Sequence, residues 1–259
     1  MADFLDTLAQ SAKATIDSGY YEVILETALS HVSLKKAILE AKNAPVITEI
    51  KAASPSAGTI RKNVEARSIA ENMEKGGAVG ISVLTEPRHF NGSLRSLVEA
   101  RRTVKLPILM KDIILSPAQL DAASKLGANV VLLIVSLFDR GYCECTLSDM
   151  IATAHSKELE VLLETHTEAE FHSAVRTHAD LVGINNRNLA TLKVDLGVTK
   201  RILEGNNAEG KVVVSESGIN APADLRFLRG CGAQAFLIGS AIMLADNVEA
   251  KVKEFVSAL

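Results

Sequence analysis

Residues 47–58 of the chain are ITEIKAASPSAG, a short apolar strand followed by a loop of small residues. Side chains alternate between the two faces of a strand, so we expect Ile47, Glu49 and Lys51 to point the same way. An acid and a base then share one face at the end of a buried strand. Burying two opposite charges is costly and does not by itself stabilise a fold, so the pattern suggests a functional site. An exposed edge strand with a surface ion pair is the alternative from this segment alone.

Short apolar runs recur after this segment, each followed by a polar or glycine-bearing turn and a segment with helical periodicity. The eight runs are residues 46–50, 80–84, 108–110, 130–134, 160–163, 181–184, 212–214 and 235–238. The helical segments are residues 64–75, 93–103, 117–126, 147–156, 168–177, 196–203, 222–228 and 248–256. Apolar strands that alternate with helices are typical of a parallel sheet covered on both faces. Eight such units predict an α/β fold, a closed (β/α)8 TIM barrel.

An open doubly wound sheet is the alternative fold. It favours a glycine-rich dinucleotide fingerprint after the first strand, and the sequence has none there. Because no linker or low-complexity tract interrupts the chain, we expect one domain over residues 1–259, with the barrel in 45–259. Residues 1–44 predict a helical extension packed on the barrel. Its first helix has an apolar face of Phe4, Leu5, Leu8, Ala12 and Ile16 and stops at Ser18-Gly19, and Ser33 predicts the N-cap of a second.

Composition excludes several classes of partner. Of the 259 residues, 47% are hydrophobic, and the net charge of -3 comes without a basic run, which argues against nucleic acid or an anionic membrane. No apolar stretch approaches the ~20 residues that span a bilayer. Three cysteines without zinc spacing predict reduced thiols in a cytoplasmic protein. No exposed apolar stripe stands out, so the oligomeric state stays open, with a monomer favoured.

Polar side chains cluster where the predicted strands end. In a TIM barrel these C-terminal ends form the active face. The six polar ends are Glu49-Ile50-Lys51, Lys111-Asp112, Glu164-Thr165-His166, Asn185-Asn186-Arg187, Ser215-Glu216-Ser217-Gly218 and Gly239-Ser240. Six such ends on one rim are hard to explain as solvated surface. Individual members, among them Asp112, Thr165 and Glu216, can still be outward-facing polar residues, and a lone histidine such as His166 is more often structural.

The last two strand ends also suggest an anion site. Loops after strands 7 and 8 of TIM barrels often bind phosphate through backbone N–H groups, and glycine permits a close approach. Ser217-Gly218 and Gly239-Ser240 occupy those positions, and Ser54 or Ser56 with Lys51 could complete the site. The sequence shows no metal-ligand spacing and no nucleophile elbow. Acid–base chemistry on a small phosphorylated substrate, without a cofactor, is what remains.

Several motifs together resemble the indole-3-glycerol phosphate synthase family. They are Glu49-Ile50-Lys51 with Ser54-Pro55-Ser56, Leu84-Thr85-Glu86 with Phe90-Asn91-Gly92-Ser93, Lys111-Asp112, Ile184-Asn185-Asn186-Arg187 and Ser215-Glu216-Ser217-Gly218-Ile219. Each motif is short, but they occur in the family's order from about residue 33 onward. The resemblance implies that the substrate is 1-(2-carboxyphenylamino)-1-deoxyribulose 5-phosphate. Its indole ring would close with loss of carbon dioxide and water, in tryptophan biosynthesis.

The resemblance also implies residue roles. Lys111 would be the general acid at the substrate ketone, and Glu164 would handle protons in the dehydration. Lys51 would hold the substrate carboxylate and could also act as an acid. Orientation of the hydroxyls and lysines would fall to Glu49, Asn185 and Ser217. The phosphate would lie on Ser54, Gly218, Gly239 and Ser240. The aromatic pocket would contain Phe90, Pro55 and Ile113.

The chain departs from the family pattern at two positions. Ile113 replaces the usual phenylalanine after Lys111-Asp112, and Asn188 replaces the usual aspartate after Asn-Asn-Arg. We also expect burial and the second lysine to lower the pKa of Lys111 toward neutrality. Two rivals are an isomerase acting on a related aminodeoxy sugar phosphate, which does not call for Lys51 and Lys111 together, and a non-catalytic phosphate-binding barrel, which needs no proton donor.

Overall fold

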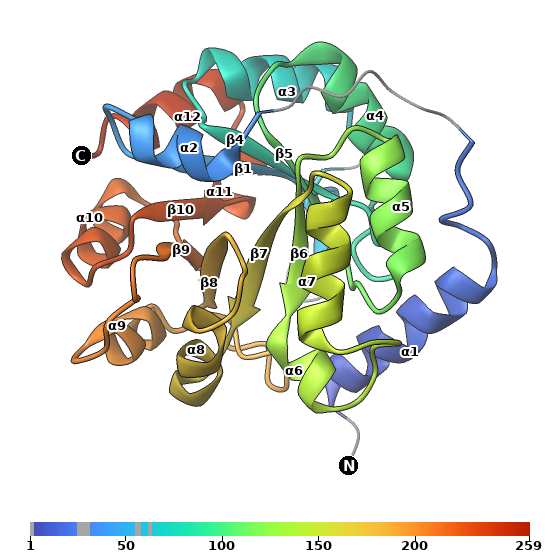
Figure 1. Ribbon diagram of the computed structural model, residues 1–259. Coiled ribbons are helices and arrows are strands. Elements are labelled where there is room, and N and C mark those ends of the chain that lie inside the picture. The colour runs from blue at the N-terminus through green and yellow to red at the C-terminus, as the bar shows by residue number, and fades with distance from the viewer. Residues whose placement is uncertain (1–2, 25–31, 55–57, 62–63) are drawn as a thin grey trace.

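The computed structural model of the protein describes residues 3–24, 32–54, 58–61 and 64–259. Within these residues, eight parallel strands close into a barrel (Figure 1). They are β1 (Val46–Ile50), β4 (Gly80–Leu84), β5 (Ile108–Lys111), β6 (Val130–Ile134), β7 (Glu160–Thr165), β8 (Leu181–Asn185), β9 (Val212–Glu216) and β10 (Ala235–Ile238). Each pairs with the next, and β10 closes the barrel on β1, where Phe236 faces Val46. The predicted TIM barrel is confirmed.

Several strands run further than the apolar pattern indicated. The pattern ended β7 at Leu163 and β9 at Val214, whereas the ladders continue through Thr165, paired with Ile184, and Glu216, paired with Asn185. Backbone hydrogen bonds do not depend on side-chain polarity, so the polar residues that look like loop starts belong to the barrel wall.

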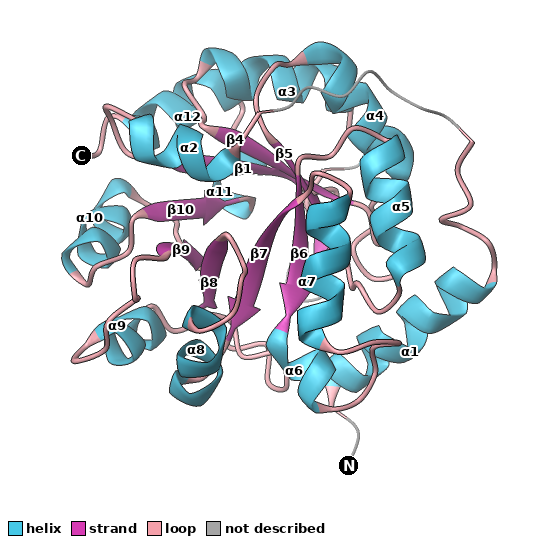
Figure 2. Cartoon of the chain, in the orientation of Figure 1, coloured by secondary structure: helices cyan, strands magenta, loops and turns pink. Residues whose placement is uncertain are grey.

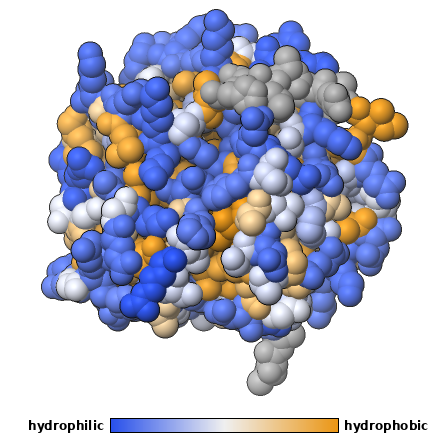
Figure 3. All heavy atoms as spheres, in the orientation of Figure 1, coloured by the Kyte–Doolittle hydropathy of each residue, from blue (hydrophilic) through white to orange (hydrophobic). Residues whose placement is uncertain are grey.

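Helices surround the strands on the outside (Figure 2). Those that follow barrel strands are α3 (Ala66–Lys75), α4 (Leu94–Thr103), α5 (Pro117–Lys125), α7 (Leu147–Ser156), α8 (Glu168–Val175), α9 (Gly197–Leu203), α10 (Pro222–Gly230) and α12 (Val248–Val256). The connections also contain two short helices, α6 (Val135–Asp139) and α11 (Ser240–Met243). A hairpin of β2 (Ala53–Ser54) and β3 (Gly58–Thr59) follows β1. The exterior seen in Figure 3 is mostly hydrophilic, with hydrophobic residues toward its centre. No helix in the described ranges is long and apolar enough to cross a membrane.

Alternation along each strand separates two cores. In β9, Val213 packs outward among the helices, whereas Val212 and Val214 pack into the barrel interior. The same rule puts Ile47 of β1 inside, together with Leu109 of β5 and Leu162 of β7. The interior is therefore filled by side chains two residues apart on each strand.

The two N-terminal helices lie apart in Figure 1 and serve opposite ends of the barrel. Helix α2 (Leu34–Glu40) begins after the predicted N-cap Ser33 and lies where the strands begin. Its Leu34 packs on Gly80 of β4, since a Cβ atom on Gly80 would be 2.6 Å from Leu34 Cδ1. Helix α1 (Phe4–Asp17) buries Leu5, Leu8, Ala9 and Ala12 and stops at Ser18, as expected. Phe4 and Leu8 line the cavity where the strands end, so α1 covers part of the barrel mouth.

Candidate active site

Four charged side chains form one layer at the C-terminal end of the barrel interior: Glu49, Lys111, Glu164 and Glu216, from alternate strands β1, β5, β7 and β9. Each lies two residues beyond an apolar interior residue, and those are Ile47, Leu109, Leu162 and Val214. Packed layers of a TIM barrel consist of four side chains from alternate strands. In this chain, a layer that apolar side chains could fill is instead three carboxyl groups and one amine.

Lys111 lies between two of the carboxylates. Its Nζ is 2.9 Å from Glu216 Oε2 and 3.2 Å from Glu164 Oε2, and it donates a hydrogen bond to each. The two glutamate side chains are only 2% exposed, so water competes little with these contacts. Three chain segments far apart in sequence thus meet at one ammonium group.

Burial and neighbouring charges move the pKa values of this layer in different directions. Burial disfavours the Lys111 ammonium, but Glu216, Glu164 and Glu49 outweigh burial and raise the pKa of Lys111. The expectation that burial and Lys51 lower this pKa is therefore wrong, because three carboxyl groups surround the amine.

The two glutamates that share Lys111 differ from each other. Burial disfavours ionisation of Glu164, yet Lys111 and His166 hold the pKa of Glu164 well below its usual range. Burial raises the pKa of Glu216, and Lys111 does not fully offset burial and the nearby Glu164. Carboxyl groups with pKa values pushed apart are the pattern expected of an acid–base pair.

Lys51 adds a second ammonium group to the mouth. Its Nζ is 2.7 Å from Glu49 Oε1, and both side chains line the same cavity, as the alternation of Ile47, Glu49 and Lys51 predicts. Gly239 packs against this pair, since a Cβ there would lie 2.5 Å from Glu49 Oε1. Asn185 Nδ2 donates to Glu164 Oε1 at 3.0 Å and so orients that carboxylate.

The loops after β9 and β10 line the same cavity through Ser217, Gly218, Gly239 and Ser240. Ser217 and Gly218 both have left-handed backbones, with φ of 67° and 84°. That conformation is unfavourable for serine, and such strain concentrates at functional sites. Ser240 begins α11, the short helix that commonly accompanies phosphate sites in this fold.

The cavity has a volume of about 330 Å³ and an apolar side. Phe90 and Ile113 lie in that wall, and Phe4 and Leu8 of α1 join them. Glu86 accepts hydrogen bonds from the backbone N–H groups of Arg88, His89 and Phe90, which fixes the loop that carries the phenyl ring.

Three predicted residues are not seen in the cavity wall. Pro55 and Ser56 lie outside the described residues, and Ser54 is described only as the end of the short strand β2. An outward-facing position was the alternative for Asp112, Thr165 and Glu216. Glu216 instead points into the barrel at Lys111. Asp112 is buried and accepts a hydrogen bond from Tyr21 at 3.0 Å, and Thr165 is buried and donates to the Gly183 carbonyl at 2.7 Å.

Comparison with known sequences decides the family. The family profile described as indole-3-glycerol phosphate synthase matches residues 6–255. The chain belongs to the indole-3-glycerol phosphate synthase family. A family member from Methanocaldococcus jannaschii is 45% identical over 227 residues, 86% of this chain and 82% of the relative. Another, from Caldanaerobacter subterraneus subsp. tengcongensis, is 38% identical over 240 residues, 92% of this chain and 89% of the relative.

Solved structures outside the family share the fold. Thiamine phosphate pyrophosphorylase from Pyrococcus furiosus superposes with a TM-score of 0.62 at 18% identity, covering 87% of this chain and 97% of its own. An N-acetylmannosamine-6-phosphate 2-epimerase from Clostridium perfringens gives a TM-score of 0.60 at 16% identity, covering 83% and 93%. At such identities the similarity concerns the barrel alone.

The family assignment gives the two departures a structural context. Ile113 is 5% exposed and fills the wall position where the family has phenylalanine, with a smaller, non-aromatic surface. Asn188 Oδ1 accepts hydrogen bonds from the N–H groups of Ala190 and Thr191 at 2.9 Å each, so it stabilises the turn after Arg187. An asparagine can accept these bonds as an aspartate can.

Sequence reasoning gave no role to two charged residues of the cavity wall, Glu216 and Arg187. Glu216 was named but could not be distinguished from surface, although its spacing from Val214 was the signal that would have placed it inside. Arg187 also lines the cavity and donates from Nη1 to the Leu192 carbonyl at 3.0 Å. Burial lowers the pKa of Arg187.

Proposed function

We propose that the protein closes the indole ring of 1-(2-carboxyphenylamino)-1-deoxyribulose 5-phosphate, with loss of carbon dioxide and water, to form indole-3-glycerol phosphate. Family membership over nearly the whole chain supports this activity. The observation that carries it is the Lys111 ammonium between Glu164 and Glu216, at the floor of a cavity with a second lysine on its rim.

Lys111 is the general acid in this proposal. As the ring carbon that bears the carboxylate attacks the ketone, the ketone oxygen gains negative charge and takes a proton from Nζ. The carboxylates that raise the pKa of Lys111 keep the proton available in the free protein. A substrate that enters this layer separates the amine from them, which strengthens the amine as an acid.

Glu164 is the group that accepts a proton in the later dehydration, because the free protein holds it ionised. Lys51 binds the substrate carboxylate until it departs as carbon dioxide. Glu49, Asn185 and Ser217 orient the lysines and the substrate hydroxyls. In this scheme Glu216 holds Lys111 in place, a role that its 2.9 Å contact supports.

The phosphate binds on Gly218, Gly239 and Ser240, with Ser54 as the fourth contact. Phe90, Ile113 and Pro55 contact the anthranilate ring. Binding energy from the phosphate then holds the reacting carbon near the ketone. A cytoplasmic enzyme is part of the proposal, and the three unpaired cysteines agree with a reducing compartment.

The direct experiment is to incubate the purified protein with the carboxyphenylamino sugar phosphate and to follow indole fluorescence. A rise in fluorescence with matching release of carbon dioxide supports the proposal. An isomerised sugar phosphate without an indole product would favour the rival isomerase, and tight binding without turnover would favour a non-catalytic barrel.

A further inference from the structure

His166 lies directly behind the charged layer, at the end of β7, and the proposed chemistry does not use it. Its imidazole is not part of the main cavity wall. It lines a second cavity of about 200 Å³ together with Ser136 and Glu170. The two cavities share Asn185, Arg187 and Leu189. His166 therefore separates Glu164 from a space on its far side.

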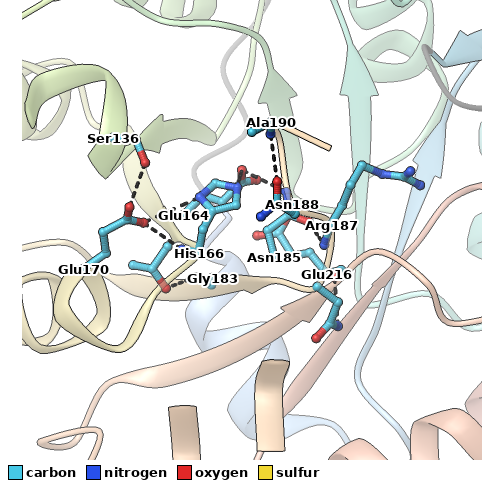
Figure 4. A network of polar contacts seen from close by, with 12 residues as sticks. Ser136, Glu164, His166, Glu170, Gly183, Asn185, Arg187, Asn188, Ala190 and Glu216 are labelled. Carbon is cyan, nitrogen blue, oxygen red and sulfur yellow. Dashed lines mark hydrogen bonds and ion pairs between the residues drawn. The ribbon is translucent and has the colours of Figure 1, made fainter. Parts of the chain in front are cut away.

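The imidazole lies between two carboxylates. Nε2 is 3.2 Å from Glu164 Oε1, and Nδ1 is 3.5 Å from Glu170 Oε2. Figure 4 shows Glu170 between Ser136 and His166, and Ser136 Oγ donates to Glu170 Oε1 at 2.8 Å. The distances are those of ion pairs, but neither ring nitrogen is aligned for a hydrogen bond with any described residue. The two carboxylates therefore stabilise the imidazolium form of the ring through its charge and not through aligned hydrogen bonds.

Glu170, His166, Glu164 and Lys111 form a row of charged groups, and this row gives the two glutamates that contact Lys111 different surroundings. Glu164 has Lys111 on one side, and His166 and Asn185 on the other. Glu216 has the same lysine, but its Oε1 is buried without a hydrogen-bond partner in the described chain. The imidazole is therefore a second cation for Glu164, beside the ammonium group that it shares with Glu216.

We propose that His166 is a positioning residue whose imidazolium, held between Glu164 and Glu170, keeps Glu164 ionised and fixed beside Lys111 so that it can accept a proton from the substrate. The proposal rests on the proposed function for the role of Glu164. Burial opposes the imidazolium, but Glu164 and Glu170 outweigh burial and raise the pKa of His166 to about 9. The ring is then charged at neutral pH.

Other charges face this row from the elements around it. The layer contributes Lys111, Glu216 and Glu49, and the second cavity contributes Arg140 and Arg187. Arg140 is already paired with Asp3 and Asp6 of α1, which leaves the imidazole as the cation in contact with both Glu164 and Glu170.

The test measures the Glu164 carboxyl group itself, without substrate. Protein with carbon-13 in its glutamate carboxyl groups is titrated by NMR, with Glu164→Gln used to assign the signal. In His166→Asn we expect the Glu164 midpoint to rise by about 1 pH unit or more, because the second cation is lost. His172→Asn is the matched control, since His172 pairs with Glu168 on the exposed face of α8, and it should leave the midpoint unchanged.

A second variant tests the row if His166→Asn folds poorly. Glu170→Gln keeps the imidazole but removes one carboxylate, so the His166 midpoint should fall by about 1 pH unit. The acid limb of kcat should move upward with the Glu164 midpoint in His166→Asn. Unchanged midpoints for Glu164 in His166→Asn and for His166 in Glu170→Gln would overturn the proposal. A wild-type protein that makes no indole would refute the proposed function while leaving this titration valid.

Discussion

The two ends of the barrel use polar side chains in opposite ways. At the N-terminal end, Glu160 of β7 accepts hydrogen bonds from Ser33 Oγ and from the backbone N–H groups of Leu34 and Lys35, which caps α2. At the C-terminal end, Glu164 of the same strand faces Lys111 and a cavity. Glu160 and Glu164 are four positions apart on one strand, yet the first carboxylate caps a helix and the second lies in the proposed active site.

The difference lies in what satisfies the polar groups. Arg101, near the N-terminal end, donates to the Leu106 carbonyl at 3.1 Å and to Asn129 Oδ1 at 3.0 Å, all within the protein. At the C-terminal end, Glu216 Oε1 is buried without a hydrogen-bond partner in the described residues, and Ser217 is left-handed. Unsatisfied and strained groups cost stability, so they mark the end where a substrate completes the interactions.

Replacing Lys111 should have the largest effect. Lys111→Met should lower kcat by about a thousandfold, because the general acid is lost. The folded state should remain, since Glu164 and Glu216 can take up protons when the amine is gone. Steady-state kinetics and inhibition by inorganic phosphate would separate chemistry from binding, and near wild-type turnover would remove Lys111 from its role.

Ser240→Asp should chiefly affect binding. A carboxylate at the start of α11 would repel the substrate phosphate and raise KM by about thirtyfold, with a much smaller change in kcat. Ser257→Asp adds the same charge at an exposed position of the α12 C-terminus and serves as the control. Equal KM values in the two variants would place the phosphate elsewhere.

Glu160→Ala should affect stability and not chemistry. Loss of the acceptor for Leu34 and Lys35 should reduce the free energy of unfolding by about 1.5 kcal/mol. Urea denaturation measures this, and kcat per folded molecule should be unchanged. Glu40→Ala removes an exposed i,i+4 pair with Lys36 on the same helix and should cost less than about 0.5 kcal/mol. A large loss of kcat in Glu160→Ala would mean that the two ends are not independent.

Gly183→Ala should give the smallest effect and sharpen the role of Glu216. A Cβ at Gly183 would lie 2.2 Å from Glu216 Oε1, the end of a flexible side chain that can move aside. The displaced carboxylate would hold Lys111 less well, and kcat should fall about fivefold, or roughly 1 kcal/mol. Gly230→Ala, with no atom near its Cβ position, should change nothing in the kinetics. Equal kcat values for Gly183→Ala and Gly230→Ala would show that catalysis tolerates a displaced Glu216.

The barrel and much of the layer follow from local patterns in the sequence. An apolar residue followed two positions later by a charged one places Glu49, Lys111 and Glu164 inside the barrel. The same rule applied to Val214 would have placed Glu216 inside as well. The outward-facing alternative for Glu216 came from ending the strand at the last apolar residue.

Other features depend on distances between strands that sequence spacing does not carry. The raised pKa of Lys111 results from three carboxyl groups that only barrel closure brings together. The meeting of Lys111 with Glu216 joins residues 105 positions apart in the sequence. Asp112 and Tyr21 meet across 91 positions of sequence, a contact that no local pattern predicts.

The position of α1 has a consequence for refolding. The closed ladder of eight strands does not include α1, yet Phe4 and Leu8 form part of the cavity wall. Arg140 and Tyr142 contact Asp3 and Asp6 at its start, and its apolar face packs on the barrel mouth through Leu5 and Leu8. A chain diluted out of denaturant should therefore regain its far-UV circular dichroism before it regains activity, with docking of the first helix as the last step.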